Sequence, residues 1–248
     1  MILSERLEAI ASFVTRGYRL ADIGTDHGFI PVKLVSEGTA PSAIALDLRE
    51  GPLEHAREHI REAGLTEKIS TRISDGLSAL KPGEADTVLI AGMGGDLLIR
   101  ILKEGMDARS LECCDFKSSV KEWILSPHTE WKAVREFLDG NGFCILEEGM
   151  VEEDGKYYLI LKAAAVSGTK AHDFYREAEQ KGISREACYC FGPELILRKD
   201  PVLLRYLGKE KSVYAGLLNR IPDNRERTAK RHGEIKHYLD LIREAMSS

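Results

Sequence analysis

The chain has 248 residues, of which 43% are hydrophobic, and its formal net charge is −5. This apolar content supports the core of one large domain, or of one medium domain with an appendage, and excludes disorder of the whole chain. The first residues lack the basic and apolar regions of a signal peptide, and no run approaches the roughly 20 apolar residues of a membrane-spanning helix. We therefore expect a soluble, cytoplasmic protein with no membrane partner. The five cysteines lack the paired CxxC spacing of a zinc site, so no metal is expected.

Strand-like apolar runs alternate with helical patterns through the first two thirds of the chain. An amphipathic segment near 3–14 precedes strands expected at 20–23, 42–46, 69–73, 87–91 and 122–125, with helices at 29–37, 51–63, 94–104 and 129–139. Such alternation predicts an open, parallel α/β sheet that binds its ligand at the carboxyl ends of the strands. Two more strands, 143–148 and 156–161, flank the turn signal Asp154-Gly155, so the sheet should end in an antiparallel hairpin.

The last third of the chain has a helical pattern, with a break at Phe191-Gly192-Pro193. Segments 200–221 and 224–246 are separated by Pro222-Asp223-Asn224, and Asp223 with Glu226 resembles a capping box. Their apolar positions predict an antiparallel helical hairpin, a short coiled coil. We divide the chain into an α/β domain at 1–166 and a helical domain at 167–248.

The two predicted domains differ in charge. Residues 167–248 contain 16 Lys and Arg against 12 Asp and Glu, a net +4, so the first 166 residues hold 19 basic and 28 acidic residues, a net −9. Such separation suggests that the helical domain meets a polyanion. From charge alone, two solvated helices rich in Lys and Arg are an equally good interpretation.

The run from Leu20 to Gly28 carries the clearest chemical signal. An apolar strand breaks there into a loop with glycines at 24 and 28 and acids at 22 and 26. Residues without Cβ let a flat ligand approach the backbone closely and permit unusual dihedral angles. The sequence therefore predicts a nucleoside cofactor at this loop.

The acids in and near this loop discriminate between cofactors. A dinucleotide site needs Gly-x-Gly-x-x-Gly, but Asp26 stands at its middle glycine, where a carboxylate would repel a pyrophosphate. S-adenosylmethionine has no pyrophosphate and carries positive charges that Asp22 and Asp26 would attract. Asp47, at the end of the second strand, suits a ribose in either class, and Asp75 could accept a hydrogen bond from an adenine amine. We favour S-adenosylmethionine over a nicotinamide dinucleotide, and residues 19–165 resemble the seven-stranded Rossmann-like methyltransferases.

Several longer motifs narrow the resemblance. They are Leu3-Ser4-Glu5-Arg6-Leu7, the loop from Ala21 to Pro31, Gly51-Pro52-Leu53, Ile90-Ala91-Gly92-Met93-Gly94-Gly95, Glu152-Glu153-Asp154-Gly155-Lys156 and Gly192-Pro193. Together they resemble the bacterial tRNA (adenine-N1)-methyltransferases that modify adenosine 22, over nearly the whole chain. The resemblance implies S-adenosylmethionine as methyl donor, a tRNA substrate and a C-terminal helical domain that helps to hold tRNA.

Site residues follow from the loops and from this resemblance. The donor is expected to contact Asp22, Gly24, Thr25, His27, Gly28, Asp47, Leu48, Asp75, Gly76, Ala91, Gly92 and Met93. The tRNA is expected to contact Arg6, Gly94, Pro127, His128, Arg198, Lys199, Arg227, Lys230 and Arg231. Basic residues of this kind follow phosphates and supply affinity rather than sequence specificity. No particular oligomer is encoded, and we expect a monomer or a weak homodimer.

The loop after the fourth predicted strand is consistent with attack by a ring nitrogen. Enzymes that methylate the exocyclic amine commonly carry an Asp/Asn-Pro-Pro-aromatic loop there, whereas this chain has Ala91-Gly92-Met93-Gly94-Gly95. The lone pair of N1 is already free, so catalysis can rest on positioning and on stabilising a cationic product. Asp26 is the candidate catalytic carboxylate; equally, it could only orient the loop or the donor.

One motif departs from the family pattern. Ser126-Pro127-His128 stands where the resemblance leads us to expect Gln-Pro-Asn, which changes the hydrogen-bonding groups offered to the substrate. This departure keeps open the alternative of a donor- and RNA-binding protein without catalysis. A separate alternative is a small-molecule methyltransferase whose C-terminal helices cap the pocket or mediate dimerisation.

Overall fold

The computed structural model describes residues 3–107, 116–166, 172–220 and 226–247, although the side chains of residues 107, 226 and 227 are outside this description. The chain forms two compact units, residues 1–172 and 173–248. The predicted domain boundary between residues 166 and 167 adjoins 167–171, which lie outside the described residues, and it stays a prediction.

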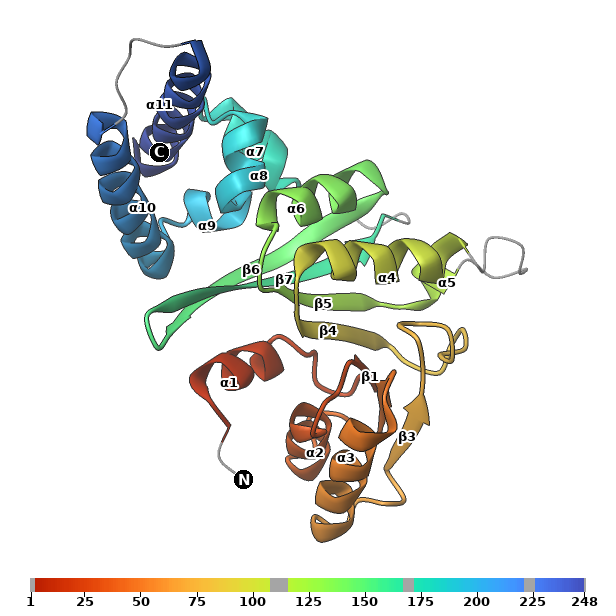
Figure 1. Cartoon of the computed structure of the whole chain (residues 1–248). Coiled ribbons are helices and arrows are strands. Elements are labelled where there is room, and N and C mark those ends of the chain that lie inside the picture. The colour runs from red at the N-terminus through yellow and green to blue at the C-terminus, as the bar shows by residue number, and fades with distance from the viewer. Residues whose placement is uncertain (1–2, 108–115, 167–171, 221–225, 248) are drawn as a thin grey trace. The chain divides into compact units, whose positions relative to one another are not determined.

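The first unit is built on a seven-stranded sheet of order β3-β2-β1-β4-β5-β7-β6 (Figure 1). Its strands are β1 (Leu20–Ile23), β2 (Ala43–Asp47), β3 (Ile69–Ile73), β4 (Thr87–Met93), β5 (Glu122–Pro127), β6 (Phe143–Glu153) and β7 (Lys156–Ala165). The first five are parallel, and β7 pairs antiparallel with both β5 and β6. The predicted α/β sheet with a terminal antiparallel hairpin is confirmed.

All but one of the helices described in this unit lie close to the predicted segments, and the exception is the short helix at Phe116–Ser119. They are α1 (Glu5–Ser12), α2 (Phe29–Ser36), α3 (Glu50–Glu62), α4 (Gly95–Asp107), α5 (Phe116–Ser119) and α6 (Trp131–Gly140). Helices α1, α2 and α3 pack in sequence, and α4 packs on α6. Crossover helices bury strands on both faces, which explains why all four residues of β1 are buried.

The strand order locates the ligand crevice. Strand β1 lies between β2 and β4, so the chain leaves the middle of the sheet in opposite directions on its two sides. Open α/β sheets bind ligands at the carboxyl ends of the strands at such a reversal. Hydrogen bonds hold the loop after β1 against the end of β2: the backbone N–H groups of Gly24 and Thr25 both donate to the carbonyl oxygen of Leu46, at 2.8 and 3.0 Å.

The β6–β7 hairpin has a two-residue turn. Asp154 and Gly155 both adopt positive φ, 51° and 70°, which is the backbone of the tight turns that join twisted antiparallel strands. Further along the hairpin the register shifts between Ile145 and Glu147 of β6. Leu146 is thus an extra residue in β6, a β-bulge.

Buried ionic groups connect strands of the sheet to one another and to α6. The side chains of Arg135 in α6 and Glu148 in β6 are both fully buried and lie 2.8 Å apart, Nε to Oε1. Glu122 in β5 is almost fully buried, 3.1 Å from the ammonium of Lys162, and accepts hydrogen bonds from Thr15. These pairs satisfy charges that would otherwise be costly to bury.

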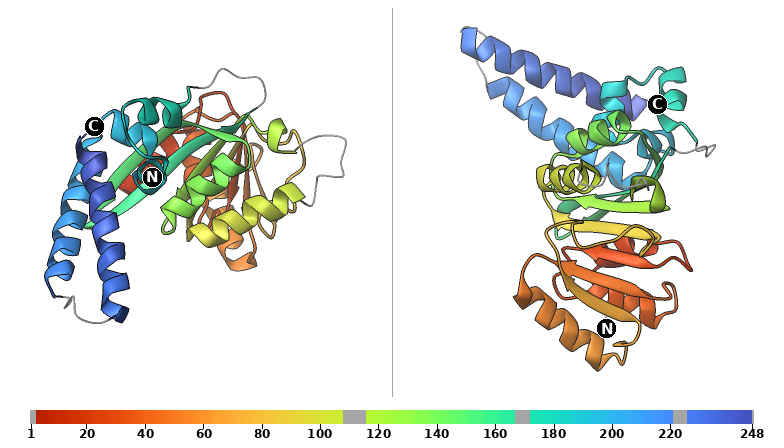
Figure 2. Two further views of the ribbon diagram at one scale, coloured as in Figure 1. Left: turned by 90° about the horizontal axis from the view of Figure 1, so that it is seen from above. Right: turned by 90° about the vertical axis from the view of Figure 1, so that its right-hand side faces the viewer.

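The second unit is helical, with α7 (Phe174–Gln180), α8 (Arg185–Phe191), α9 (Pro193–Leu197), α10 (Pro201–Arg220) and α11 (Glu226–Ser247). The predicted break is present, since Gly192 at φ 94° separates α8 from α9. Helices α10 and α11 lie side by side in both views of Figure 2, and the rings of Tyr214 and Tyr238 meet between them at 4.6 Å. The helical hairpin is confirmed, whereas its coiled-coil character stays a prediction. The predicted cap at Pro222-Asp223-Asn224 lies outside the described residues.

Candidate active site

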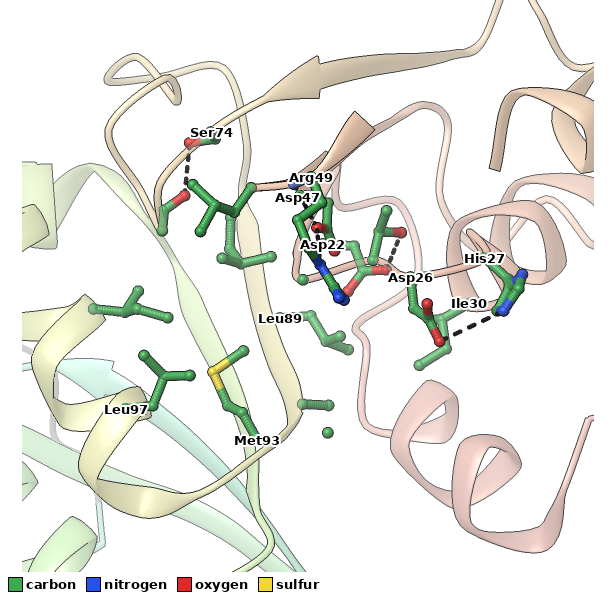
Figure 3. A pocket seen from close by; sticks show the side chains of 18 of the residues that line it. Asp22, Asp26, His27, Ile30, Asp47, Arg49, Ser74, Leu89, Met93 and Leu97 are labelled. Atoms are coloured by element: carbon green, nitrogen blue, oxygen red, sulfur yellow. Dashed lines mark hydrogen bonds and ion pairs between the residues drawn. The ribbon is translucent and has the colours of Figure 1, made fainter. Parts of the chain in front are cut away.

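A cavity of about 610 Å³ lies at the carboxyl ends of the central strands. Its lining includes the ends of β1, β2 and β4, the loop after β3, and residues of α1 and α4. In Figure 3, Asp22, Asp26 and Asp47 are grouped on one side, with Met93 and Leu97 on the other. Fourteen predicted site residues line it: Arg6, Asp22, Gly24, Thr25, Asp26, His27, Asp47, Leu48, Asp75, Gly76, Ala91, Gly92, Met93 and His128.

Asp22 is the most perturbed acid of the cavity. It is buried at the carboxyl end of β1, and its Oδ2 accepts a hydrogen bond of 2.6 Å from the Thr25 hydroxyl. Burial raises the pKa of Asp22 to about 7; the Thr25 hydrogen bond opposes this rise, and the neighbouring Asp47 adds to it. A cationic ligand beside Asp22 would relieve this cost of a buried negative charge.

The next residues form the exposed rim of the cavity. Asp26 has φ 52°, so its backbone occupies the left-handed region, and its side chain is 68% exposed. Nε2 of His27 lies 3.8 Å from Oδ2 of Asp26, and the His27 ring stacks on His55 at 4.9 Å and on Phe29 at 5.3 Å. The backbone carbonyl of His27 also lies 2.8 Å from Nδ1 of a further histidine in α3. Of the two carboxylates at the loop, Asp26 is the exposed one and Asp22 the buried one.

The ends of β2 and β3 supply two more acids. Asp47 is nearly buried, and its Oδ1 accepts a 2.9 Å hydrogen bond from the backbone N–H of Arg49. Asp75 is exposed in the turn after β3, and Gly76 follows it at φ 53°. A Cβ on Gly76 would lie 3.0 Å from a side-chain carbon of Ile101, so the turn packs tightly on α4.

The end of β4 brings backbone and sulfur to the cavity. The Met93 carbonyl accepts a 2.8 Å hydrogen bond from the His128 backbone N–H, which joins the end of β4 to the loop that follows β5. The Met93 methyl approaches Gly24, where a Cβ would lie 3.1 Å from it. At Gly95 a Cβ would lie 2.6 Å from the carbonyl oxygen of Thr129, so this glycine permits the close contact between α4 and the loop before α6.

Arg6 and His128 are 122 residues apart in sequence but meet at the cavity rim. Nη1 of Arg6 lies 2.8 Å from Nε2 of His128. The Arg6 guanidinium also lies over the Tyr158 ring, 5.0 Å from its centroid, and the His128 ring meets Tyr158 edge-on at 5.6 Å. Partial burial, Arg6 and Lys156 lower the pKa of His128.

Three predicted residues of the first unit are not among the lining residues. Gly28 is the N-cap of α2, and a Cβ there would lie 3.0 Å from that of Ala56. Gly94 adjoins Thr129 Oγ1, and the carbonyl of the buried Pro127 accepts a hydrogen bond from the Trp131 indole.

The remaining predicted residues belong to the second unit. Arg198 forms ion pairs with Glu194 and Asp200 at 3.3 and 3.0 Å, so part of its charge is neutralised. Lys199 and Lys230 are exposed. Arg231 lies 3.4 Å from a glutamate one turn along α11, and the side chain of Arg227 lies outside the described residues.

Sequence reasoning missed part of the cavity lining, namely Leu7, Ile23, Phe29, Ile30, Arg49, Ser74, Leu89, Leu97, Arg100 and Ile101. Most are apolar residues whose periodicity marks them only as helix or strand positions. Arg49 carries a detectable signal, because it follows the acid that ends β2. Among the described residues, no group of His, Cys, Asp or Glu is arranged to hold a metal, and no helix is long and apolar enough to cross a membrane.

Residues 3–161 match a family model described as a methyltransferase domain. The chain is 33% identical over 247 residues to the tRNA (adenine(22)-N(1))-methyltransferase of Bacillus subtilis (strain 168), covering 98% of this chain and 97% of that protein. The solved B. subtilis m1A22 tRNA methyltransferase has a TM-score of 0.82 at 32% identity, with 99% of each chain covered. A Streptococcus pneumoniae protein solved with S-adenosyl-L-methionine has a TM-score of 0.80 at 31% identity, covering 99% of this chain and 100% of that chain. The chain belongs to the family of bacterial tRNA (adenine(22)-N1)-methyltransferases.

Proposed function

We propose that the chain transfers a methyl group from S-adenosylmethionine to N1 of adenosine 22 in tRNA. The observation that carries this proposal is the row of carboxylates, Asp22, Asp26, Asp47 and Asp75, along one cavity at the reversal point of the sheet. Family membership supports the reaction and the acceptor.

Different groups of the cavity are suited to different parts of the proposed donor. Asp22 is buried, and a ligand ammonium beside it would lower its pKa from about 7. Asp47 would accept hydrogen bonds from ribose hydroxyls, and Asp75 one from the adenine amine. Gly24, Gly76 and Gly92, all at positive φ, let backbone line the cavity without side chains. Bound S-adenosylmethionine supplies an electrophilic methyl group on a positively charged sulfur.

The proposed role of Asp26 follows from its exposure. N1 of adenine needs no base before it attacks, but the purine ring becomes cationic as the new bond forms. A carboxylate at the rim would stabilise that charge, the electrostatic effect that most often dominates catalysis. An Asp26→Asn variant should retain donor affinity and lose turnover about 100-fold. Unchanged turnover would mean that Asp26 takes no part in methyl transfer.

We propose that the second unit binds the tRNA backbone through Arg198, Lys199, Arg227, Lys230 and Arg231. With a net charge of only +4 from residue 167 onward, recognition of tRNA shape by both units is expected rather than tight capture by one. The target base must also leave its stack to reach the cavity.

We further propose a cytoplasmic location, where tRNA is modified, and a monomer or weak homodimer.

The decisive experiment incubates the purified chain with methyl-labelled S-adenosylmethionine and two tRNA transcripts that differ only at position 22. We expect label in the adenosine transcript, mapped to N1 of that base, and none in the guanosine transcript. A Glu54→Gln variant, altered at an exposed acid of α3, should transfer label like the original chain. Normal binding of donor and tRNA without transfer would instead support the non-catalytic alternative.

A further inference from the structure

The Arg6–His128 contact defines the protonation of a residue at the cavity rim. A guanidinium has hydrogen-bond donors only, so Nε2 of His128 must accept the 2.8 Å hydrogen bond from Nη1 of Arg6. The ring proton therefore resides on Nδ1, and the imidazole is neutral. This tautomer is assigned from the partner's chemistry, independently of any hydrogen position.

Neighbouring groups hold Arg6 in the orientation that the contact requires. The Arg6 backbone N–H donates to Oε1 of Glu153 at 3.0 Å, and its Nε lies 3.9 Å from the other oxygen of that carboxylate. The guanidinium lies over the Tyr158 ring, and that ring also contacts His128. Among the described residues, Arg6 from α1 and Lys156 and Tyr158 from β7 act on or contact the imidazole, and Glu153 from β6 contacts Arg6.

We propose that Arg6 is a positioning residue that fixes His128 as a neutral donor, and that Nδ1–H of His128 hydrogen-bonds to N3 or N7 of the target adenine. This proposal rests on the proposed function and adds a base-reading contact to it.

The contacts of His128 within the described residues leave Nδ1 of its ring able to donate a hydrogen bond to the target base. His128 lines the cavity and has two hydrogen bonds within the described chain, one at Nε2 and one at its backbone N–H. Both leave Nδ1–H available to a ligand. During attack by N1, the acceptors that remain on the purine ring are N3 and N7, which match a donor. A doubly protonated imidazole would also donate, but it would place a second cation beside a purine that is becoming positive. The contact with Arg6 excludes that form.

The first test compares His128→Leu with the original chain on three tRNAs carrying adenosine, 3-deazaadenosine or 7-deazaadenosine at position 22. All three bases keep N1. We expect kcat/KM to fall about tenfold for His128→Leu on adenosine, equivalent to one hydrogen bond, and not to fall on the analogue that lacks the contacted nitrogen. An equal loss on all three substrates would overturn the proposal, because His128 would then act without touching either nitrogen.

The second test separates positioning by Arg6 from a structural role. In Arg6→Met the imidazole loses its cationic neighbour, so its pKa should rise and activity should fall more steeply below about pH 7 than in the original chain. Adding His128→Leu should abolish that extra fall, and Arg6→Lys, which keeps a donor and the charge, should restore the original profile. Parallel profiles for Arg6→Met and the original chain would refute the positioning role.

These outcomes are distinct from failure of the proposed function. If the original chain transfers no methyl group to any adenosine transcript, the reaction itself is wrong. If it transfers normally and only the analogue pattern fails, the base contact is wrong and the reaction stands. Arg16→Met, at an exposed arginine just after α1, is the matched control for loss of one positive charge.

Discussion

Replacing Asp22 by Asn should stabilise the donor-free protein at alkaline pH. The pKa of Asp22 is raised from 3.8 to about 7, chiefly by burial, so the folded chain retains a proton that the unfolded chain has released. Folding stability therefore falls as pH rises through this interval, and the full cost is present above about pH 7. Asn carries no charge at any pH, so the variant does not lose folding stability in this way.

The size of the effect follows from the two pKa values. The interval from 3.8 to about 7, at about 1.4 kcal/mol per pKa unit, corresponds to about 4 kcal/mol. Most of the interval lies above pH 4.5. The free energy of unfolding of Asp22→Asn, relative to that of the original chain, should therefore increase by about 3 kcal/mol between about pH 4.5 and about pH 8. A constant offset from the altered hydrogen bond with Thr25 cancels in this comparison.

Urea unfolding of both proteins at the two pH values, without donor, measures the difference. Asp75→Asn is the control, because Asp75 lines the same cavity but is exposed, and its substitution should change stability little at either pH. The same Asp22→Asn protein should bind S-adenosylmethionine more weakly by calorimetry at about pH 8. A stability gain for Asp22→Asn that does not grow with pH would refute the assignment of Asp22 as a buried acid with a raised pKa.

Three further substitutions, two of them paired with a control substitution, test packing, buried charge and tRNA binding. Gly95→Ala would place a Cβ 2.6 Å from a backbone oxygen and should cost about 1–3 kcal/mol in thermal unfolding, whereas Gly51→Ala, in open space within α3, should stabilise by about 0.5–1 kcal/mol. Arg135→Met removes the ion pair of a fully buried glutamate, Glu148, and should cost about 3–5 kcal/mol in urea unfolding, against less than about 1 kcal/mol for Lys132→Met at an exposed pair; equal losses would contradict the role of burial. Lys230→Ala should weaken tRNA binding and lower its salt dependence by about one counterion, with donor affinity unchanged; an unaltered salt slope would place Lys230 away from phosphates.

Local patterns were sufficient to predict the strands and most of the first unit. Strand β1 and the loop after it were predicted because an apolar run, two glycines and two acids lie within nine residues. The terminal hairpin was predicted from Asp154-Gly155, since that dipeptide readily adopts positive φ. The short helix α5 carries too few residues for a periodic signal and was not predicted.

Contacts between distant segments had no such signal. Arg6 and His128 were both predicted to touch substrate, but the hydrogen bond between them depends on α1 and the loop after β5 meeting in the fold. Likewise the raised pKa of Asp22 arises from burial and from Asp47 on the adjacent strand, neither of which is a property of the loop sequence. The role of the second unit in tRNA binding was inferred from charge and resemblance and stays a prediction.

The bulge at Leu146 bears on how the protein avoids self-association. Strand β6 is one edge of the sheet, and a regular edge offers unpaired N–H and C=O groups that a strand of another molecule can bind. The bulge interrupts this row next to the exposed carboxylate of Glu147, so an approaching strand would lose its register and bury a charge. On this physical argument, the extra residue disfavours pairing of this edge with a strand of another molecule.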